Sequence, residues 1–188
     1  MSPKPLIVMA LESEGQGRLE KLGYEVLYCG VGKVNACYYL TRRLVSGPKV
    51  PYVLNIGSAG SSSFKAHELV AADRFVQRDM DASGIGFAKG ETPFEKDPPI
   101  TISFKPYFTH LPHGICGSGD SFLQGPTPVE SNIFDMEAYA LAKVCKLEGV
   151  DFVSVKYITD GADADAAGHW EEHLKHAAQA FCDLLIKA

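Results

Sequence analysis

Acidic side chains recur where the predicted strands and helices end, and this position is where carboxylates can act on a ligand. They are Glu12, Glu14, Asp120, Asp135, Glu137 and Asp160. Any one of them alone is more often a helix cap or a surface group. Gathered at one edge of a sheet, they would suit chemistry that builds positive charge on a substrate, such as glycosidic cleavage through an oxocarbenium ion.

The stretch TDGAD, residues 159–163, is the most informative of these sites. An apolar run beginning at residue 151 predicts a buried strand, and Asp160 stands at its end. Open α/β sheets bind their ligands at the carboxyl ends of the strands. We therefore expect the strand to hold Asp160 rigidly, and the small residues after it to form a loop that closes over a ligand.

The elements that must position these carboxylates alternate between strands and helices. Apolar runs predict strands over 5–11, 24–30, 52–57, 67–76, 113–120 and 151–160, and apolar residues at helical spacing predict helices over 33–45, 136–149 and 169–188. The third strand is expected to end at Gly57, and a long Gly- and Pro-rich loop is expected over 79–99. The pattern predicts one α/β domain over 1–188, with helices on both faces of a mixed, largely parallel, twisted sheet.

Two motifs that suggest other chemistry do not fit their patterns. The segment CGVGKVN lacks the first glycine and the final Ser or Thr of a phosphate-binding loop, and Asn35 stands where a dinucleotide fingerprint needs its third glycine. The segment HWEEH places His169 and His173 four residues apart, as zinc ligands can be, but a zinc site needs three or four ligands. We therefore expect neither a metal nor a cofactor.

Composition excludes several classes of function. The chain has 188 residues, of which 46% are hydrophobic and 22% charged, with a net charge of -5. No basic stripe is present for nucleic acid, and no apolar run approaches the length of a membrane span. The five cysteines are scattered, so free buried thiols are expected rather than disulfides. These features favour a cytoplasmic protein that binds neither nucleic acid nor membrane.

Six motifs together resemble those of a known family. ALESEG, GVGKVNA, NIGSAGS, SGDSF, DMEA and TDGAD occur in the order and near the spacing seen in the nucleoside phosphorylase/nucleosidase superfamily. The resemblance is greatest to the methylthioadenosine/S-adenosylhomocysteine nucleosidases, and it covers residues 7–174. It implies a purine nucleosidase that hydrolyses the N-glycosidic bond of a nucleoside, with a modified 5' group, to free base and a ribose derivative.

The resemblance also implies roles for individual residues. Glu14 would activate the attacking water, Asp160 would protonate purine N7, and Glu137 would bind the ribose hydroxyls. Phe122 would stack on the purine, and Leu123 would supply backbone contacts. The remaining implied substrate-binding positions are Ser58, Ala59 and Gly60 in a turn beneath the sugar, Leu11, Val31 and Trp170 toward the 5' group, and Ser121, Asp135, Met136 and Thr159.

Some residues depart from the family pattern and leave alternatives open. The chain is shorter than usual, and the expected long helical segment is reduced to residues 100–116, the region that shapes the dimer interface in the family. A homodimer or higher homo-oligomer is still expected. Phosphorylases of the family commonly have arginine where this chain has Asn55, although Arg78 could reach a phosphate. A phosphorylase, a futalosine-type hydrolase and a non-catalytic nucleoside-binding protein remain alternatives.

Overall fold

A computed structural model describes residues 4–95, 100–162 and 166–187, and in α5 it describes the side chains of residues 176–186. The strands are β1 (Leu6–Met9), β2 (Glu25–Tyr28), β3 (Tyr52–Ser61), β4 (Leu69–Gln77), β5 (Thr101–Ser103), β6 (His113–Ser118), β7 (Ile133–Asp135) and β8 (Asp151–Asp160). The helices are α1 (Glu12–Gly15), α2 (Arg18–Lys21), α3 (Lys33–Ser46), α4 (Ala138–Glu148) and α5 (Ala166–Lys187), with a short 3₁₀ turn at Ser83–Ile85.

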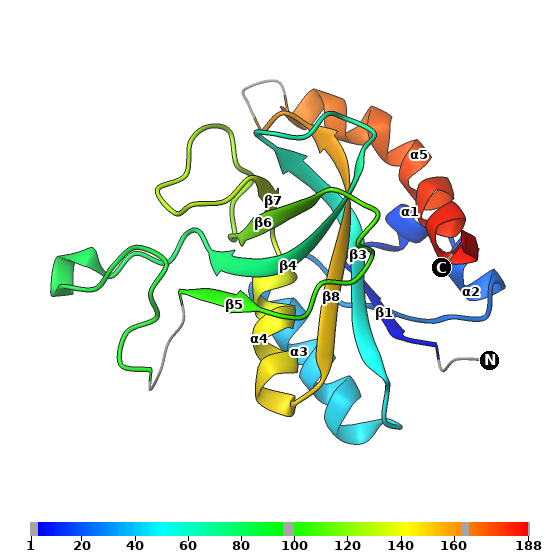
Figure 1. Ribbon diagram of the computed structural model, residues 1–188, viewed down its shortest axis with the longest axis horizontal. Helices are drawn as coiled ribbons and strands as arrows, with labels where there is room; N and C mark the ends of the chain where they lie inside the picture. The colour runs from blue at the N-terminus through cyan, green and yellow to red at the C-terminus, as the bar shows by residue number, and fades with distance from the viewer. Residues whose placement is uncertain (1–3, 96–99, 163–165, 188) are drawn as a thin grey trace.

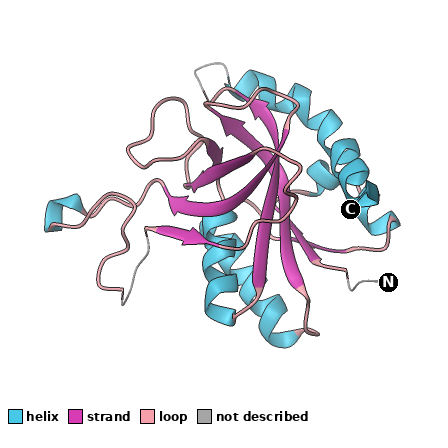
Figure 2. Ribbon diagram, in the orientation of Figure 1, coloured by secondary structure: helices cyan, strands magenta, loops and turns pink. Residues whose placement is uncertain are grey.

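Helices cover both faces of one central sheet, as Figures 1 and 2 show. On one face, α3 and α4 bury Leu40 and Leu141 in a core with β-strand side chains. On the other face, α2 and α5 contribute Leu19 and Phe181 to a second core. This arrangement confirms the predicted three-layer α/β/α architecture. None of the described helices combines the length and apolarity needed to cross a membrane.

The sheet is mixed and largely parallel, as the alternation of strands and helices predicted. Among the described strands, parallel pairs join β1 to β2, β1 to β3, β3 to β8, β4 to β6 and β6 to β7. Antiparallel pairs join β3 to β7, β4 to β5 and β4 to β8. Strands β3, β8, β4, β6 and β7 thereby form a closed ring of pairings, which brings the ends of strands distant in sequence together.

Strand β3 is longer than its sequence predicted. It was expected to end at Gly57 but continues to Ser61. The parallel ladder with β8 continues through Gly57, which lies opposite Lys156, and its register shifts between Ala59 and Gly60. After this shift, Gly60 and Ser61 also pair with β7. The pairing with two neighbouring strands therefore outweighs the weak strand preference of glycine.

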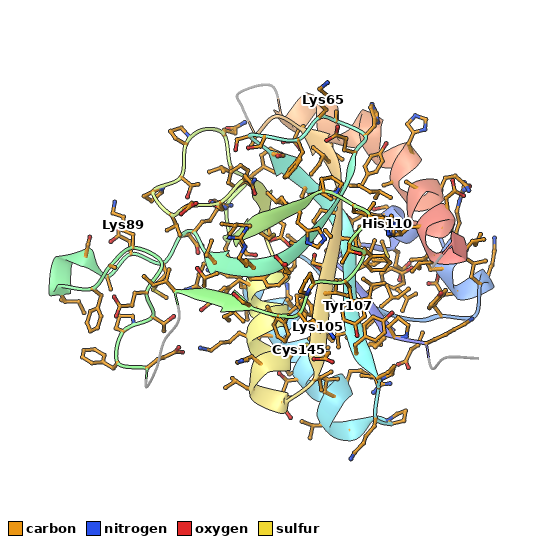
Figure 3. The ribbon with its side chains drawn as sticks, viewed as in Figure 1. Lys65, Lys89, Lys105, Tyr107, His110 and Cys145 are labelled. Carbon is orange, nitrogen blue, oxygen red and sulfur yellow. The ribbon has the colours of Figure 1, made fainter. Side chains whose placement is uncertain are left out.

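The segment between β5 and β6, residues 104–112, is irregular and contains no helix, in agreement with the expected loss of the long helical segment. Figure 3 labels Tyr107 and His110 of this segment, with Tyr107 beside β3 and His110 on the side of α5. The Tyr107 ring stacks on Tyr52 with centroids 5.2 Å apart, and Phe108 and Leu111 pack against the core beside α5. Apolar packing thus fixes a segment that has little regular secondary structure.

Candidate active site

A cavity of about 260 Å³ lies where β1, β3, β7 and β8 end, and it gathers nearly all of the predicted site residues. Those lining it are Leu11, Glu14, Val31, Ser58, Ala59, Gly60, Ser121, Phe122, Leu123, Asp135, Met136, Glu137, Thr159 and Asp160. Predicted positions spread over most of the chain therefore meet in one place. The residues beneath the predicted sugar position, 58–60, lie within strand β3 and not in a turn, because the β8 ladder continues past them.

Trp170 is the one predicted site residue whose side chain lies outside the described part of the structure. Its backbone belongs to α5, which begins at Ala166 and therefore before the predicted start at residue 169. The placement of Trp170 near the 5' group stays a prediction.

Glu14 is held by donors from two elements. It lies in α1, which follows β1 directly, and only 3% of its surface is exposed. Its Oε1 accepts hydrogen bonds from the Ser58 backbone N–H at 2.9 Å and from the Ser58 hydroxyl at 2.7 Å. Its Oε2 accepts the Leu11 backbone N–H at 3.2 Å. The carboxylate is therefore fixed in orientation at the cavity wall.

Gly57 leaves space between Glu14 and a buried lysine. A Cβ at position 57 would lie 3.4 Å from Glu14 Oε1 and 3.8 Å from Lys156 Nζ. These two distances place the carboxylate and the ammonium group within about 7 Å of each other on the same wall of the cavity. Because glycine has no side chain, the space between the two charged groups stays open.

Asp160 ends β8 with both carboxylate oxygens engaged. Its Oδ1 accepts the Ala162 backbone N–H at 2.9 Å, and its Oδ2 lies 2.8 Å from the Thr159 hydroxyl. The same hydroxyl lies 3.3 Å from the Ala59 carbonyl oxygen. A Cβ at Gly60 would approach Asp160 Oδ1 to 2.5 Å, so a larger residue at position 60 would displace this carboxylate. Strand β8 and its neighbour β3 together position Asp160.

Glu137 is the N-cap of α4 and is 8% exposed. Its Oε1 accepts the Gly32 backbone N–H at 2.8 Å, which joins the GVGK turn to the start of α4. Burial, followed by the nearby Asp135 charge, raises the pKa of Glu137 from its ordinary value of 4.5 to about 7. Glu137 therefore titrates near neutral pH.

Lys156 belongs to this site, although the sequence prediction did not include it. It lies in β8 with 1% of its surface exposed, and its Nζ forms an ion pair with Asp135 Oδ2 at 2.8 Å. The Asp135 carboxylate also accepts hydrogen bonds from Ser118 Oγ at 2.5 Å and from the Ala138 backbone N–H at 2.9 Å. The ion pair lowers the pKa of Asp135 against the opposing effect of burial. The available signal was a lone cation inside the apolar strand sequence FVSVKYIT.

Arg78 also lines the cavity, directly after β4, and is 6% exposed. The sequence suggested that it could reach a phosphate. Instead, its guanidinium donates to the Ser121 carbonyl, to Ser121 Oγ at 3.2 Å and to the Gly119 carbonyl at 3.4 Å. Its contacts are therefore with the loop that follows β6.

No group of three or more His, Cys, Asp or Glu side chains is arranged to hold a metal within the described residues. The side chains of His169 and His173 lie outside that part, so the expectation of no metal site stays a prediction. The described cysteines are Cys29, Cys37, Cys116, Cys145 and Cys182, and all of them are free, as predicted. Four are buried as expected, but Cys37 is exposed because it lies on the solvent side of α3.

The geometry provides four buried carboxylates around one cavity, of which Asp135 is ion-paired with Lys156 and the other three, Glu14, Glu137 and Asp160, are each held by a different set of hydrogen-bond donors. Such a set can place an acid at one end of a ligand, a base beside an attacking water, and a negative charge near a developing cation. The aromatic ring of Phe122, 47% exposed, stands at the same cavity and offers a flat apolar surface.

Comparison with known proteins gives consistent matches. The family model of the phosphorylase superfamily matches residues 16–188. A 5'-methylthioadenosine/S-adenosylhomocysteine nucleosidase of Marinomonas sp. is 33% identical, over 87% of this chain and 79% of the relative. A protein of the same name from Actinobacillus succinogenes is 30% identical, over 91% of this chain and 82% of the relative.

Solved structures share the fold. A 5'-methylthioadenosine/S-adenosylhomocysteine nucleosidase of Helicobacter pylori, crystallised with a pyrrolopyrimidine compound, superposes with a TM-score of 0.83 at 24% identity over 98% of both chains. A futalosine hydrolase mutant of Helicobacter pylori superposes with a TM-score of 0.83 at 24% identity over 94% of both chains.

Proposed function

The chain belongs to the phosphorylase superfamily, and from that premise we propose that it is a purine nucleosidase. It would hydrolyse the N-glycosidic bond of a purine nucleoside to free base and a ribose derivative. The observation that carries this proposal is the convergence of Glu14, Glu137 and Asp160 on one cavity. Relatives that carry the nucleosidase name and cover most of the chain support it.

Asp160 is assigned the proton transfer to the leaving base. The Thr159 hydroxyl has one hydrogen, and it can donate either to Asp160 Oδ2 or to the Ala59 carbonyl. When it donates to Ala59, its oxygen can accept a hydrogen bond from a protonated Asp160. The surroundings of Asp160 therefore accommodate both the acid and its conjugate base, as a general acid requires.

Glu14 is assigned the activation of water. Its three donors fix the carboxylate, and the open space at Gly57 lies on the side that faces Lys156. A water in that space could accept from the ammonium group and donate to the carboxylate. We place the attacking water there. Glu137 is assigned to the ribose hydroxyls, with its Oε1 kept in position by Gly32 and its other oxygen toward the sugar.

Water is favoured over phosphate as the nucleophile because the cationic and amide groups near the cavity are engaged. The Asn55 amide donates to the Val8 carbonyl at 3.1 Å and accepts from the Ser154 hydroxyl at 2.8 Å. Lys156 pairs with Asp135, and Arg78 binds loop carbonyls. Phosphate recognition calls for cationic donors that are available to the anion. Because these groups are already bound to protein partners, the site favours hydrolysis over phosphorolysis.

Two expectations about domain organisation and oligomeric state accompany the proposal. Residues 1–188 would form a single nucleosidase domain. The chain would form a homodimer or higher homo-oligomer, which is supported by the exposed apolar side chains of Val34, Tyr38 and Val45 on α3.

A nucleoside panel tests the activity. Methylthioadenosine, S-adenosylhomocysteine, adenosine, inosine and futalosine are incubated with the protein, with and without phosphate, and free base is measured by chromatography. Release of base from at least one 5'-modified nucleoside without phosphate is expected. Base release that requires phosphate would indicate a phosphorylase, and binding without any release would indicate a non-catalytic nucleoside-binding protein. Glu14→Gln, which keeps the size of the side chain, serves as the inactive control.

A further inference from the structure

Arg78 is a buried cation whose partners are unusual for a charge. Its side chain is 6% exposed, and no carboxylate lies within ion-pair distance of it among the described residues. Its Nε is buried and has no hydrogen-bond partner in that part of the chain. The nearby charges of Asp79 and Asp135 favour the guanidinium only from a distance. Burying a charge with no carboxylate in direct contact is costly, so its hydrogen bonds must supply the compensation.

All the side-chain hydrogen bonds of Arg78 go to one short segment. Nη2 donates to the carbonyls of Ser121 and Gly119, and Nη1 lies 3.2 Å from Ser121 Oγ. A Cβ at Gly119 would lie 2.8 Å from Arg78 Cζ, so the guanidinium packs directly on the glycine backbone. The planar fork of arginine contacts several acceptors at once, which a lysine ammonium cannot reproduce.

This segment needs an external support. Strand β6 ends at Ser118, and no helix or strand follows until β7 begins at Ile133. Phe122 and Leu123 come immediately after the anchored residues and line the cavity. Because the Phe122 ring is 47% exposed, packing alone does not fix it. Its position depends on the backbone at 119–121. Arg78 binds the carbonyls of this backbone, while the backbone N–H groups at Gly119 and Asp120 donate to the Asp135 carbonyl at 3.1 Å and to Asp79 Oδ2 at 2.9 Å.

We propose that Arg78 is a positioning residue that sets Phe122 and Leu123 against the purine base. This inference rests on the proposed function, because it takes the ligand of these two residues to be the base. In this role the charge of Arg78 strengthens hydrogen bonds to carbonyls and is not available to bind phosphate. The expected consequence of its loss is weak base binding, with the bond-breaking step little changed.

Three variants distinguish the effect of the Arg78 hydrogen bonds from the effect of its charge. Arg78→Lys keeps the positive charge but loses the planar guanidinium that contacts several acceptors at once. Gly119→Ala keeps every charge, but its Cβ would lie 2.8 Å from Arg78 Cζ and 3.0 Å from Asp79 Cγ and would displace the guanidinium. Arg74→Lys is the matched control, because Arg74 is exposed on β4, the strand that ends just before Arg78. Affinity for the released purine base is measured by calorimetry, together with KM, kcat and the affinity for inorganic phosphate.

The first two variants are expected to weaken base binding and raise KM by about 10- to 100-fold, as the loss of charge-assisted hydrogen bonds would predict, with a smaller change in kcat. The control should match the native protein, and none of the three variants should alter phosphate affinity. Gly119→Ala remains informative if Arg78→Lys does not fold.

Native base affinity in both variants would overturn the inference. Loss of phosphate binding in Arg78→Lys, with native base affinity in Gly119→Ala, would instead make Arg78 an anion-binding residue. If the native protein neither binds nor releases any purine base, the proposed function fails and the inference fails with it. Base release by the native protein with unaffected variants removes the inference alone.

Discussion

At the scale of single residues, Asp160 offers the clearest separation of chemistry from folding. In Asp160→Asn, the amide oxygen can still accept the Ala162 N–H, and the amide nitrogen can donate to the Thr159 hydroxyl, which in turn donates to the Ala59 carbonyl. The variant should therefore fold normally but have no proton to give. Since general acids contribute about 10²–10⁴ in rate, base release should slow by that factor. Turnover and melting temperature are measured together.

The control for this variant is Asp151→Asn, at the opposite and exposed end of β8. It should leave both turnover and melting temperature unchanged. If Asp160→Asn melts at a lower temperature but turns over at the native rate, Asp160 is only a structural cap for the loop that follows it.

Glu137 makes stability depend on pH. Its pKa is raised from 4.5 to about 7, so the folded state binds the proton more tightly than the unfolded state. Stability is therefore highest below the unfolded value and decreases as the pH rises through about 7, by on the order of 3 kcal/mol in total. Glu137→Gln removes this ionisation and can still accept from Gly32. Relative to the native protein, it should be more stable at about pH 8 than at about pH 4.

The measurement for Glu137 is denaturant unfolding of both proteins across this range of pH. An unchanged stability difference between the two proteins at all pH values would contradict the assignment. The same variant should lose any step near pH 7 in the kcat/KM profile of the native protein, because that step would report Glu137 in the free enzyme.

Residue types at strand ends could be predicted, but cations inside the fold could not. Glu14 and Asp160 follow apolar runs, so their chemistry and placement are visible in the sequence. Lys156 lies in the middle of a strand, and only the register that sets it opposite Gly57 brings it near Glu14. The contacts of Arg78 depend on the conformation of an irregular loop, which no local pattern specifies.

At the scale of elements, the Asp135–Lys156 ion pair joins β7, β8 and the start of α4. Lys156→Met would leave the Asp135 carboxylate buried without its counter-ion. Loss of one partner of a buried pair typically costs about 3–5 kcal/mol, so unfolding should become easier by that amount. Adding Asp135→Asn removes the isolated charge and should recover part of the loss. Denaturant unfolding of both single variants and of the double variant measures the coupling free energy between Asp135 and Lys156. A Lys156→Met variant as stable as the native protein would contradict this prediction.

Element boundaries were predictable where the signal is local. Helix α4 ends at Glu148, followed by Gly149 with a φ of 66°, as its glycine stop predicted. The continuation of β3 past Gly57 was not visible, since it depends on the β8 and β7 ladders. The assignment of Phe122 to the base stays a prediction, although its place at the cavity is now known.

At the scale of the whole molecule, the alternation of strands and helices was enough to predict three layers with a largely parallel sheet. The closed ring of β3, β8, β4, β6 and β7 was not predictable, because the antiparallel β4–β8 pairing joins segments far apart in the chain. That ring also brings the ends of β3, β7 and β8 to one cavity, so the site is a consequence of tertiary pairing as much as of its motifs.

We propose that water attacks the sugar carbon of a purine nucleoside in this cavity. The decisive measurement is turnover in phosphate-free water enriched in the heavy oxygen isotope, with mass spectrometry of both products. We expect free purine base and a ribose derivative that carries one heavy oxygen at the anomeric carbon, and no such product from Glu14→Gln. A sugar 1-phosphate that forms only when phosphate is added, or the absence of base release from every purine nucleoside, would contradict the account.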